Sequence, residues 1–382
     1  MTGREPAALV HGMGKELTKP DWPPLTSDEV RALLSRYAAA PARAVEVIWH
    51  SPRPFAASAL VRWGDATVFV KRHHRSVRTA VQLADEHAFT AHLRDRGIAA
   101  PFIFRMQDGA TSVTSGKYLY EVQERAPGAD LYRDAMSWTP FTSLRHANAA
   151  GAALARLHLA AADFPLRARP FGALIDSQQI ITAADPLGAI ARLIAARPGL
   201  TYLDQRNWSQ EMGGCVLLMI GRAGPLLARL ATQWGHGDWH PSNLTWTSAG
   251  ADADVAGVID LGLANRTSAV HDLAVALERS AFGWLGLDSG HVDADLGAID
   301  ALLDGYESVR PLDNAEAAAL AEVLPVAHVD YALSEVEYFA DVVRRPGYAD
   351  LAYDGYLLGH ARWFRGSCGA AVLDHLRRRD WA

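Results

Sequence analysis

The segment His236-Gly237-Asp238-Trp239-His240-Pro241-Ser242-Asn243, with Ile259-Asp260-Leu261-Gly262 after it, decides how this sequence is interpreted. Asp238 and Asn243 are five residues apart, and Asp260 follows Asn243 by seventeen residues, at the end of an expected strand. Phosphoryl transfer needs a carboxylate beside the attacking hydroxyl, and a second carboxylate and a neutral oxygen ligand to hold Mg²⁺ on the phosphates. The pattern therefore indicates Asp238 as the catalytic base and Asn243 with Asp260 as Mg²⁺ ligands.

Two other interpretations of this segment stay open on the residues alone. Gly, Asp, Pro, Ser and Asn all favour turns, so the segment fits a purely structural turn. His236, Asp238 and His240 also alternate, and on one strand they would face one side, as zinc or iron ligands of a metal-dependent hydrolase or oxygenase would. The metal interpretation leaves Asn243 and Asp260 without a role.

Length and composition describe a globular protein with more than one domain. The chain has 382 residues, too many for one ordinary domain, with 49% hydrophobic and 21% charged residues. Its net charge of -6 disfavours a dedicated nucleic-acid binder, so no nucleic-acid partner is expected. Two cysteines, Cys215 and Cys368, form at most one bridge and cannot make a disulfide framework.

The distribution of apolar residues predicts no membrane association. The run from Cys215 to Ile220 covers six residues, whereas a membrane span needs about 18–20. Residues 1–9 carry Arg4 and Glu5 and lack the apolar stretch of a signal peptide. A soluble cytoplasmic protein with free thiols, either a monomer or a homodimer, is the expectation.

Local patterns predict an α+β protein with two lobes. Thr26 and Glu29 match a capping box for a helix that runs through Leu34, and Gly64-Asp65 marks a turn between strands. The other expected elements are strands over 45–71 and 118–124, helices over 79–96, 144–161 and 221–233, a hairpin over 246–259, and mainly helix from 270 onward. The expected organisation is a lead-in over 1–40, a small lobe over 41–123, a hinge over 124–128 and a larger helical lobe over 129–382.

The order His-Gly-Asp-x-His-x-x-Asn and then Ile-Asp-x-Gly resembles the aminoglycoside phosphotransferase/choline kinase-like superfamily, a small-molecule branch of the protein-kinase-like fold. The resemblance covers roughly residues 40–380. It implies an N-lobe with an antiparallel sheet plus one helix, a mainly helical C-lobe, and ATP bound between the lobes. It further implies Mg²⁺ as a cofactor and the transfer of the γ-phosphate to a hydroxyl of a small molecule.

The resemblance also assigns roles to residues other than Asp238, Asn243 and Asp260. Lys71, at the end of an expected strand, matches the phosphate-binding lysine, and Glu86 in the next helix matches its glutamate partner. The backbones of Glu124 and Ala126 would bond the adenine edge. His236 and His240 would support the catalytic loop, and Asp272, twelve residues after Asp260, would hydrogen-bond that loop. A carboxylate in the first turn of a helix is the simpler interpretation of Asp272, and the two roles can coexist.

Two departures from the family pattern bear on the function. Thr267-Ser268-Ala269 stands where the family often has Gly-Asp-Pro, which favours a homoserine-kinase-like branch over an antibiotic phosphotransferase. The loop over 51–58 contains no glycine, although glycine lets backbone N–H groups approach phosphates closely. Ser58 or Arg53 would have to substitute there. The glycine-free loop also keeps open a nucleotide-binding pseudokinase.

The acceptor is predicted only as a class: a small amino alcohol, hydroxy amino acid or sugar-like alcohol, with an aminoglycoside as the alternative. Arg266 is the candidate partner for a carboxylate of such a substrate, and Asp330 or Glu337 is the candidate for an amine. Asp330, Ser334, Glu337 and Asp341 recur at helical spacing, and this polar stripe would face either the substrate or the solvent.

Overall fold

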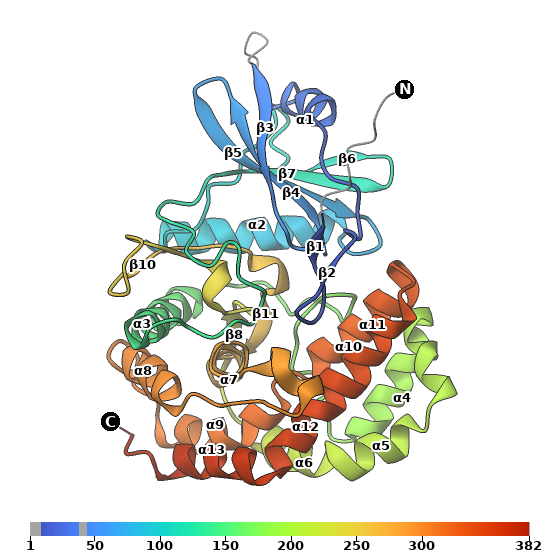
Figure 1. Ribbon diagram of the computed structural model, residues 1–382, viewed down its shortest axis with the longest axis vertical. Helices are drawn as coiled ribbons and strands as arrows, with labels where there is room; N and C mark the ends of the chain where they lie inside the picture. The colour runs from blue at the N-terminus through green and yellow to red at the C-terminus, as the bar shows by residue number, and fades with distance from the viewer. Residues whose placement is uncertain (1–8, 38–43, 382) are drawn as a thin grey trace. The chain divides into compact units, whose positions relative to one another are not determined.

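The computed structural model describes residues 9–37 and 44–381, which fall into two units (Figure 1). The first unit contains the chain up to Asp95 together with Ala99–Pro127, and the second contains Arg96–Ile98 and the chain from Gly128 onward. The chain passes between the units after Pro127, within the expected hinge segment 124–128. Residues 1–8 and 38–40 of the expected lead-in lie outside the described residues.

The first unit is built on a five-stranded antiparallel sheet in the order β3-β4-β5-β7-β6. Its strands are β3 (Val45–His50), β4 (Ala57–Trp63), β5 (Ala66–His74), β6 (Val113–Ser115) and β7 (Tyr118–Glu124). Val61, Val68 and Val70 are fully or almost fully buried, as the two-residue spacing of the apolar residues predicts. The expected turn between β4 and β5 forms at Gly64, whose φ of 61° favours glycine.

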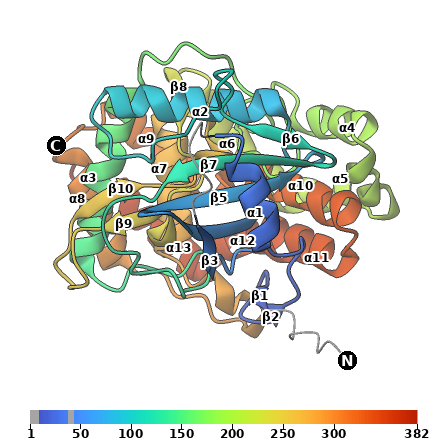
Figure 2. The ribbon, with the colours of Figure 1, turned by 90° about the horizontal axis from the view of Figure 1, so that it is seen from above.

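Two helices contact opposite faces of this sheet, α1 (Ser27–Leu34) and α2 (Ala80–Asp95). In Figure 2, α1 is drawn over the strands and α2 lies to one side of them. Successive side chains of β5 point to opposite faces. Arg72 pairs with Glu29 of α1 at 2.6 Å, whereas His73 contacts Glu121, which also binds His87 of α2. The predicted capping box of α1 is present. The expected lead-in therefore contributes to the first unit, with the short hairpin of β1 (Val10–His11) and β2 (Leu17–Thr18).

The second unit is mainly helical. Its helices are α3 (Leu144–Ala161), α4 (Pro186–Ala196), α5 (Trp208–Cys215), α6 (Leu217–Leu227), α7 (Ala269–Ser280), α8 (Leu296–Glu307), α9 (Asn314–Val323), α10 (Val329–Glu337), α11 (Pro346–Asp350), α12 (Leu358–Arg365) and α13 (Ser367–Arg378). Helices α3 and α8 lie side by side in Figures 1 and 2. A Cβ on Gly151 would come within 1.9 Å of the Leu302 carbonyl oxygen, so glycine permits this close packing.

Two antiparallel strand pairs of the second unit flank residues 236–243, which we call the central segment. β8 (Thr232–Gly235) pairs with β11 (Asn265–Ser268), and β9 (Leu244–Trp246) pairs with β10 (Val255–Val258). The second pair confirms the hairpin expected over 246–259. The helix expected over 221–233 was wrong at its end, because α6 stops at Leu227 and the following residues enter β8.

Among the described residues no helix is both long and apolar enough to cross a membrane. Cys215 is buried, Cys368 is exposed, and both are free thiols.

Candidate functional site

The central segment turns sharply as it leaves β8. Gly237 has a φ of 72°, and a Cβ at this position would lie 2.7 Å from the Leu263 carbonyl oxygen. Only glycine fits both conditions without strain. Pro241–Asn243 then form one 3₁₀ turn, which leads directly into β9. The turn-forming residues of the sequence therefore give the loop that carries Asp238 its shape.

Asp272 in the first turn of α7 holds the start of the loop. Its carboxylate accepts hydrogen bonds from the backbone N–H groups of His236 at 2.7 Å and Gly237 at 2.8 Å, and from Nε2 of His158 at 2.9 Å. Burial alone would raise the pKa of Asp272, but the hydrogen bond from His158 and the bonded amides outweigh it and lower the pKa to about 2. The loop is thus fixed by a buried, ionised carboxylate.

Replacing Asp272 by asparagine is expected to lower the free energy of unfolding by about 3 kcal/mol at pH 7, because His158 loses its charged partner in a fully buried position. Because the pKa of Asp272 is lower in the folded than in the unfolded protein, its ionised carboxylate stabilises the fold above about pH 4. This contribution is lost as the pH falls towards 2. Urea unfolding of wild type and variant at several pH values measures both effects. Equal stability at pH 7 would contradict the account.

Asp238 is held in a network of three side chains. Asn243 Nδ2 donates to one carboxylate oxygen at 3.0 Å, Arg279 donates to the other, and His240 Nε2 lies 3.4 Å from the carboxylate. The side chain keeps 18% of its surface exposed. Burial raises the pKa of Asp238, but the charges of His240 and Arg279 outweigh burial and hold this pKa far below its ordinary range. The carboxylate is therefore ionised and aligned.

Arg279 is a site residue that the sequence analysis missed. It lies on α7 with its side chain 1% exposed, and its guanidinium lies 4.5 Å from the ring centroid of Tyr331 and 5.6 Å from that of Trp138. A signal was available, because Glu278 and Arg279 directly follow the apolar residues 273–277 of α7. Arg279 is seven residues, or about two helical turns, after Asp272, which places both on one helix face.

Asn243 and Asp260 lie at the two ends of one hairpin. Asn243 immediately precedes β9, and Asp260 is the second residue after β10. The Ile259 N–H donates to the Asn243 carbonyl oxygen at 3.0 Å. Because Asn243 directs its amide Nδ2 to Asp238, its Oδ1 is the oxygen left for another ligand. Asp260 is exposed and has a φ of 57°. One amide oxygen and one exposed carboxylate fit the ligand preference of Mg²⁺.

The two histidines of the segment make contacts within the loop. His236 Nε2 donates to the Ile259 carbonyl oxygen at 3.0 Å, and His236 Nδ1 accepts from the Asp238 N–H at 3.2 Å. His240 Nδ1 lies 3.0 Å from the Ser242 hydroxyl, and its Nε2 lies 3.1 Å from Asn243 Nδ2. Over residues 9–37 and 44–381, His236, Asp238 and His240 do not form a group with closely spaced ligand atoms. This arrangement gives no support to the metal-hydrolase interpretation.

The nucleotide-binding candidates lie in the first unit. Lys71 of β5 is directly opposite Ser58 of β4, and Glu86 is a buried residue of α2. Lys71 and Glu86 share a charged neighbourhood, because both act electrostatically on His73 and His87.

The same neighbourhood holds Glu121, which the sequence analysis also missed. Glu121 is fully buried, and its oxygens lie 3.0 Å from His73 Nε2 and 2.5 Å from His87 Nε2. Although burial raises the pKa of Glu121, the two histidines keep it well below its ordinary value.

The hinge candidates and the substrate candidates have partners within their own units. The Glu124 N–H donates to the Phe102 carbonyl oxygen at 2.8 Å, and Ala126 is half-buried. Arg266 donates to Thr232 through Nε and Nη2, and Glu337 pairs with Arg197 at 2.6 Å.

The polar stripe that begins on α10 was expected to face either the substrate or the solvent. Most of it does not face the solvent. Asp330, Ser334 and Glu337 are buried, whereas Asp341 is exposed. Asp330 accepts from the Ser177 hydroxyl and from the Ile180 N–H, so it ties α10 to the segment before α4.

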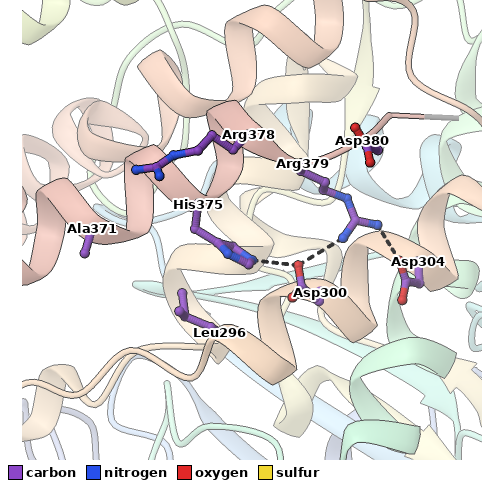
Figure 3. Close-up of a pocket in the computed structure, with 8 residues that line it drawn as sticks. All are labelled: Leu296, Asp300, Asp304, Ala371, His375, Arg378, Arg379 and Asp380. Carbon is purple, nitrogen blue, oxygen red and sulfur yellow. Dashed lines mark hydrogen bonds and ion pairs between the residues drawn. The ribbon is translucent and has the colours of Figure 1, made fainter.

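A surface pocket of about 640 Å³ lies away from all of these residues, between α8 and α13 (Figure 3). Its charged side chains mostly pair with one another across the pocket. Asp300 binds His375 at 2.8 Å and Arg379 at 3.0 Å, and Arg379 also binds Asp304. The pocket contains none of the predicted site residues.

Two solved structures of small-molecule kinases share this fold. An aminoglycoside phosphotransferase from Alicyclobacillus acidocaldarius superposes with a TM-score of 0.52 at 18% identity, covering 94% of this chain and 97% of the other. A microcompartment-associated aminopropanol kinase gives a TM-score of 0.53 at 19% identity, covering 87% and 98%. These likenesses confirm the expected α+β, protein-kinase-like fold with a small antiparallel-sheet lobe and a helical lobe.

Sequence relatives point to the same group. The homoserine kinase of Xanthobacter autotrophicus is 29% identical over 254 residues, covering 64% of this chain and 66% of the relative. That of Methylobacterium radiotolerans is 30% identical over 245 residues, covering 60% and 61%. The match thus spans a little under two thirds of these relatives. The family model described as "Phosphotransferase enzyme family" matches residues 55–312, which is more than half of the chain. The chain therefore belongs to the phosphotransferase enzyme family.

Proposed function

We propose that this protein is an ATP- and Mg²⁺-dependent phosphotransferase that moves the γ-phosphate of ATP to a hydroxyl of a small molecule. The observation that carries the proposal is the arrangement around Asp238. Its ionised carboxylate is aligned by Asn243 and Arg279 on a loop that Asp272 holds in place. Positioning and charge compensation are the main tasks of a phosphotransferase, because the transition state of phosphoryl transfer is loose.

Each unit has its own task in this proposal. In the first unit, Lys71, supported by Glu86, binds the phosphates, Ser58 contributes from the neighbouring strand, and the backbones of Glu124 and Ala126 bind the adenine. In the second unit, Asn243 Oδ1 and the Asp260 carboxylate hold Mg²⁺, which supplies positive charge to the phosphates when bound. The Glu124 N–H is already bonded to Phe102, so Glu124 would act through its carbonyl oxygen.

In the chemical step, the acceptor hydroxyl oxygen attacks the γ-phosphorus and the bond to the β,γ-bridging oxygen breaks. The hydroxyl proton passes to Asp238, and ADP carries away the bond electrons. The low pKa of Asp238 makes it a weak base, so its main contribution is to orient the hydroxyl. The carboxylate takes the proton only as the oxygen becomes bonded to phosphorus.

Arg279 is expected to set the pH range in which Asp238 works. In the wild type the depressed pKa of Asp238 predicts no loss of kcat from this group between pH 5 and 8. In Arg279→Met, Asp238 loses one of the positive charges that lower its pKa while His240 remains, so the pKa of Asp238 rises and the fall of kcat on the acid side moves to higher pH. The measurement is kcat against pH for wild type, Arg279→Met and Arg156→Met, whose arginine is exposed on α3. Unshifted profiles in all three proteins would remove Arg279 from this role.

For the acceptor, we propose a small alcohol that carries an amine or a carboxylate. The homoserine kinases among the sequence relatives support this class, as does Thr267-Ser268-Ala269 in place of Gly-Asp-Pro. The wall of the acceptor site would come from the second unit, where Asp330 keeps one buried oxygen without a hydrogen-bond partner among the described residues. Arg266 and Glu337 would first have to release Thr232 and Arg197.

The test of the proposed function is ADP release across a library of hydroxylated metabolites and antibiotics, followed by steady-state kinetics with homoserine, choline and kanamycin. Preference for homoserine or choline supports the metabolic class. A clear preference for kanamycin, with a KM in the micromolar range, would overturn the proposed acceptor and leave the kinase assignment intact. We place the reaction in the cytoplasm, a reducing compartment that keeps free thiols such as Cys215 and Cys368 reduced. A monomer or a homodimer remains part of the proposal.

A further inference from the structure

A second group of buried polar side chains lies in the second unit and has no role in the proposed reaction. Glu278 comes from α7, His328 from the residue before α10, and His360 from α12. Their exposed fractions are 2%, 5% and 0%. Each can offer one ligand atom, and these atoms lie within 4.8 Å of one another. Buried polar groups are normally hydrogen-bonded, so each of these three side chains is expected to have partners for its polar atoms.

His328 is already oriented as a metal ligand would be. Its Nε2 donates to the Leu357 carbonyl oxygen at 3.1 Å, which leaves Nδ1 with a free electron pair. Nδ1 is buried and has no hydrogen-bond partner within residues 9–37 and 44–381. A ligating imidazole usually donates its other N–H to a carbonyl or carboxylate oxygen in this manner.

Glu278 and His360 pair with each other, and His360 keeps one further buried polar atom. His360 Nδ1 lies 2.7 Å from Glu278 Oε1, which is an ion-pair contact. Nε2 of His360 is buried and has no hydrogen-bond partner among the described residues. The His360 ring stacks on Trp284 with centroids 3.7 Å apart, which restricts its rotation towards other partners. An unsatisfied buried polar atom is costly, and one cation would satisfy an atom from each of the three residues.

We propose that Glu278, His328 and His360 form a binding site for a divalent transition metal ion, with Zn²⁺ as the best match. Two imidazoles and one carboxylate suit zinc, whereas Mg²⁺ prefers oxygen ligands alone. Zinc distances of about 2.0–2.2 Å place tetrahedral ligand atoms about 3.4 Å apart, so the three atoms, now within 4.8 Å of one another, have to move closer together. A fourth ligand position is left for water.

The ion would join α7, α10 and α12 within the second unit. Glu278 is directly followed by Arg279, the residue that pairs with Asp238, so the ion would also fix the part of α7 that carries Arg279. Its role is structural and separate from the Mg²⁺ of the reaction. The proposal does not depend on the acceptor or on phosphoryl transfer.

The test uses the full-length protein after chelator treatment, without nucleotide. Zn²⁺ or Co²⁺ is added, excess metal is removed, and the bound metal and the thermal unfolding temperature are measured. We expect one ion per chain, a higher unfolding temperature, and a visible Co²⁺ spectrum of a site with nitrogen ligands. His328→Asn and Glu278→Gln should each weaken Zn²⁺ binding at least about tenfold. His375→Asn, which alters a histidine between α8 and α13, and Asp260→Asn should bind as the wild type does.

Retention of wild-type affinity by both His328→Asn and Glu278→Gln would overturn the proposal, as would the absence of stoichiometric metal in the wild type. If either variant fails to fold, X-ray absorption of the zinc-loaded wild type decides. Two nitrogen ligands and a carboxylate oxygen at about 2.0–2.2 Å support the site, and an all-oxygen shell rejects it.

Discussion

Asp238→Asn should lower kcat by about 10²–10⁴ while leaving the affinity for Mg·ATP close to that of the wild type. Asparagine has nearly the same shape but cannot accept the hydroxyl proton, and it removes the carboxylate that pairs with Arg279. The nucleotide contacts are assigned to other residues, so the loss should fall on turnover. The measurements are steady-state kcat with the best acceptor and the dissociation constant of Mg·ATP for both proteins.

The matched control for this change is Asp204→Asn, because Asp204 is an exposed aspartate of the same unit. Its kinetics should equal those of the wild type. Unchanged turnover in Asp238→Asn would remove Asp238 from the mechanism. A variant that loses ATP binding as strongly as turnover would also contradict the assigned role.

Asp260→Ala should abolish Mg²⁺-dependent activity, because the change removes the charged ligand of the metal and leaves the phosphate charge uncompensated. In the wild type, Mg·ATP should raise the unfolding temperature, since a ligand that binds only the folded state stabilises it. In Asp260→Ala most of this increase should disappear. Thermal unfolding with ATP and increasing Mg²⁺ measures the effect independently of the acceptor.

Asp252→Ala is the control here, because Asp252 is exposed in the turn of the same hairpin and lies away from its two ends. This variant should keep both activity and stabilisation by Mg·ATP. If Mg·ATP stabilises Asp260→Ala as much as the wild type, the metal role of Asp260 is wrong.

Features that depend on neighbours in sequence could be predicted. The capping box at Thr26 and Glu29, the turn at Gly64 and the hairpin between Asn243 and Asp260 follow from local turn chemistry and residue periodicity. The fold also followed, because a short ordered set of residue types identified the family. The end of the helix expected over 221–233 failed for a tertiary reason, since pairing with β11 draws residues after α6 into β8.

Features that depend on distant parts of the chain could not be predicted. Arg279 reaches Asp238 from a residue 41 positions away, and Glu121 meets His73 and His87 across a sheet and a helix. No local pattern encodes such contacts. The burial of Asp330 on α10 likewise reflects packing against the segment around Ser177. Sequence spacing places Asp330 in a polar stripe but does not predict that this part of the stripe is buried.

The central claim is that Asp238 on this loop serves the transfer of phosphate from ATP to an alcohol. Its most direct test is ³¹P NMR of the wild type with Mg·ATP and the acceptor panel, alongside Asp238→Asn and Asp204→Asn. We predict a phosphomonoester signal that grows in step with ADP for the wild type and Asp204→Asn and is nearly absent for Asp238→Asn. A wild-type protein that binds Mg·ATP but forms neither phosphomonoester nor ADP would contradict the account and indicate a nucleotide-binding pseudokinase.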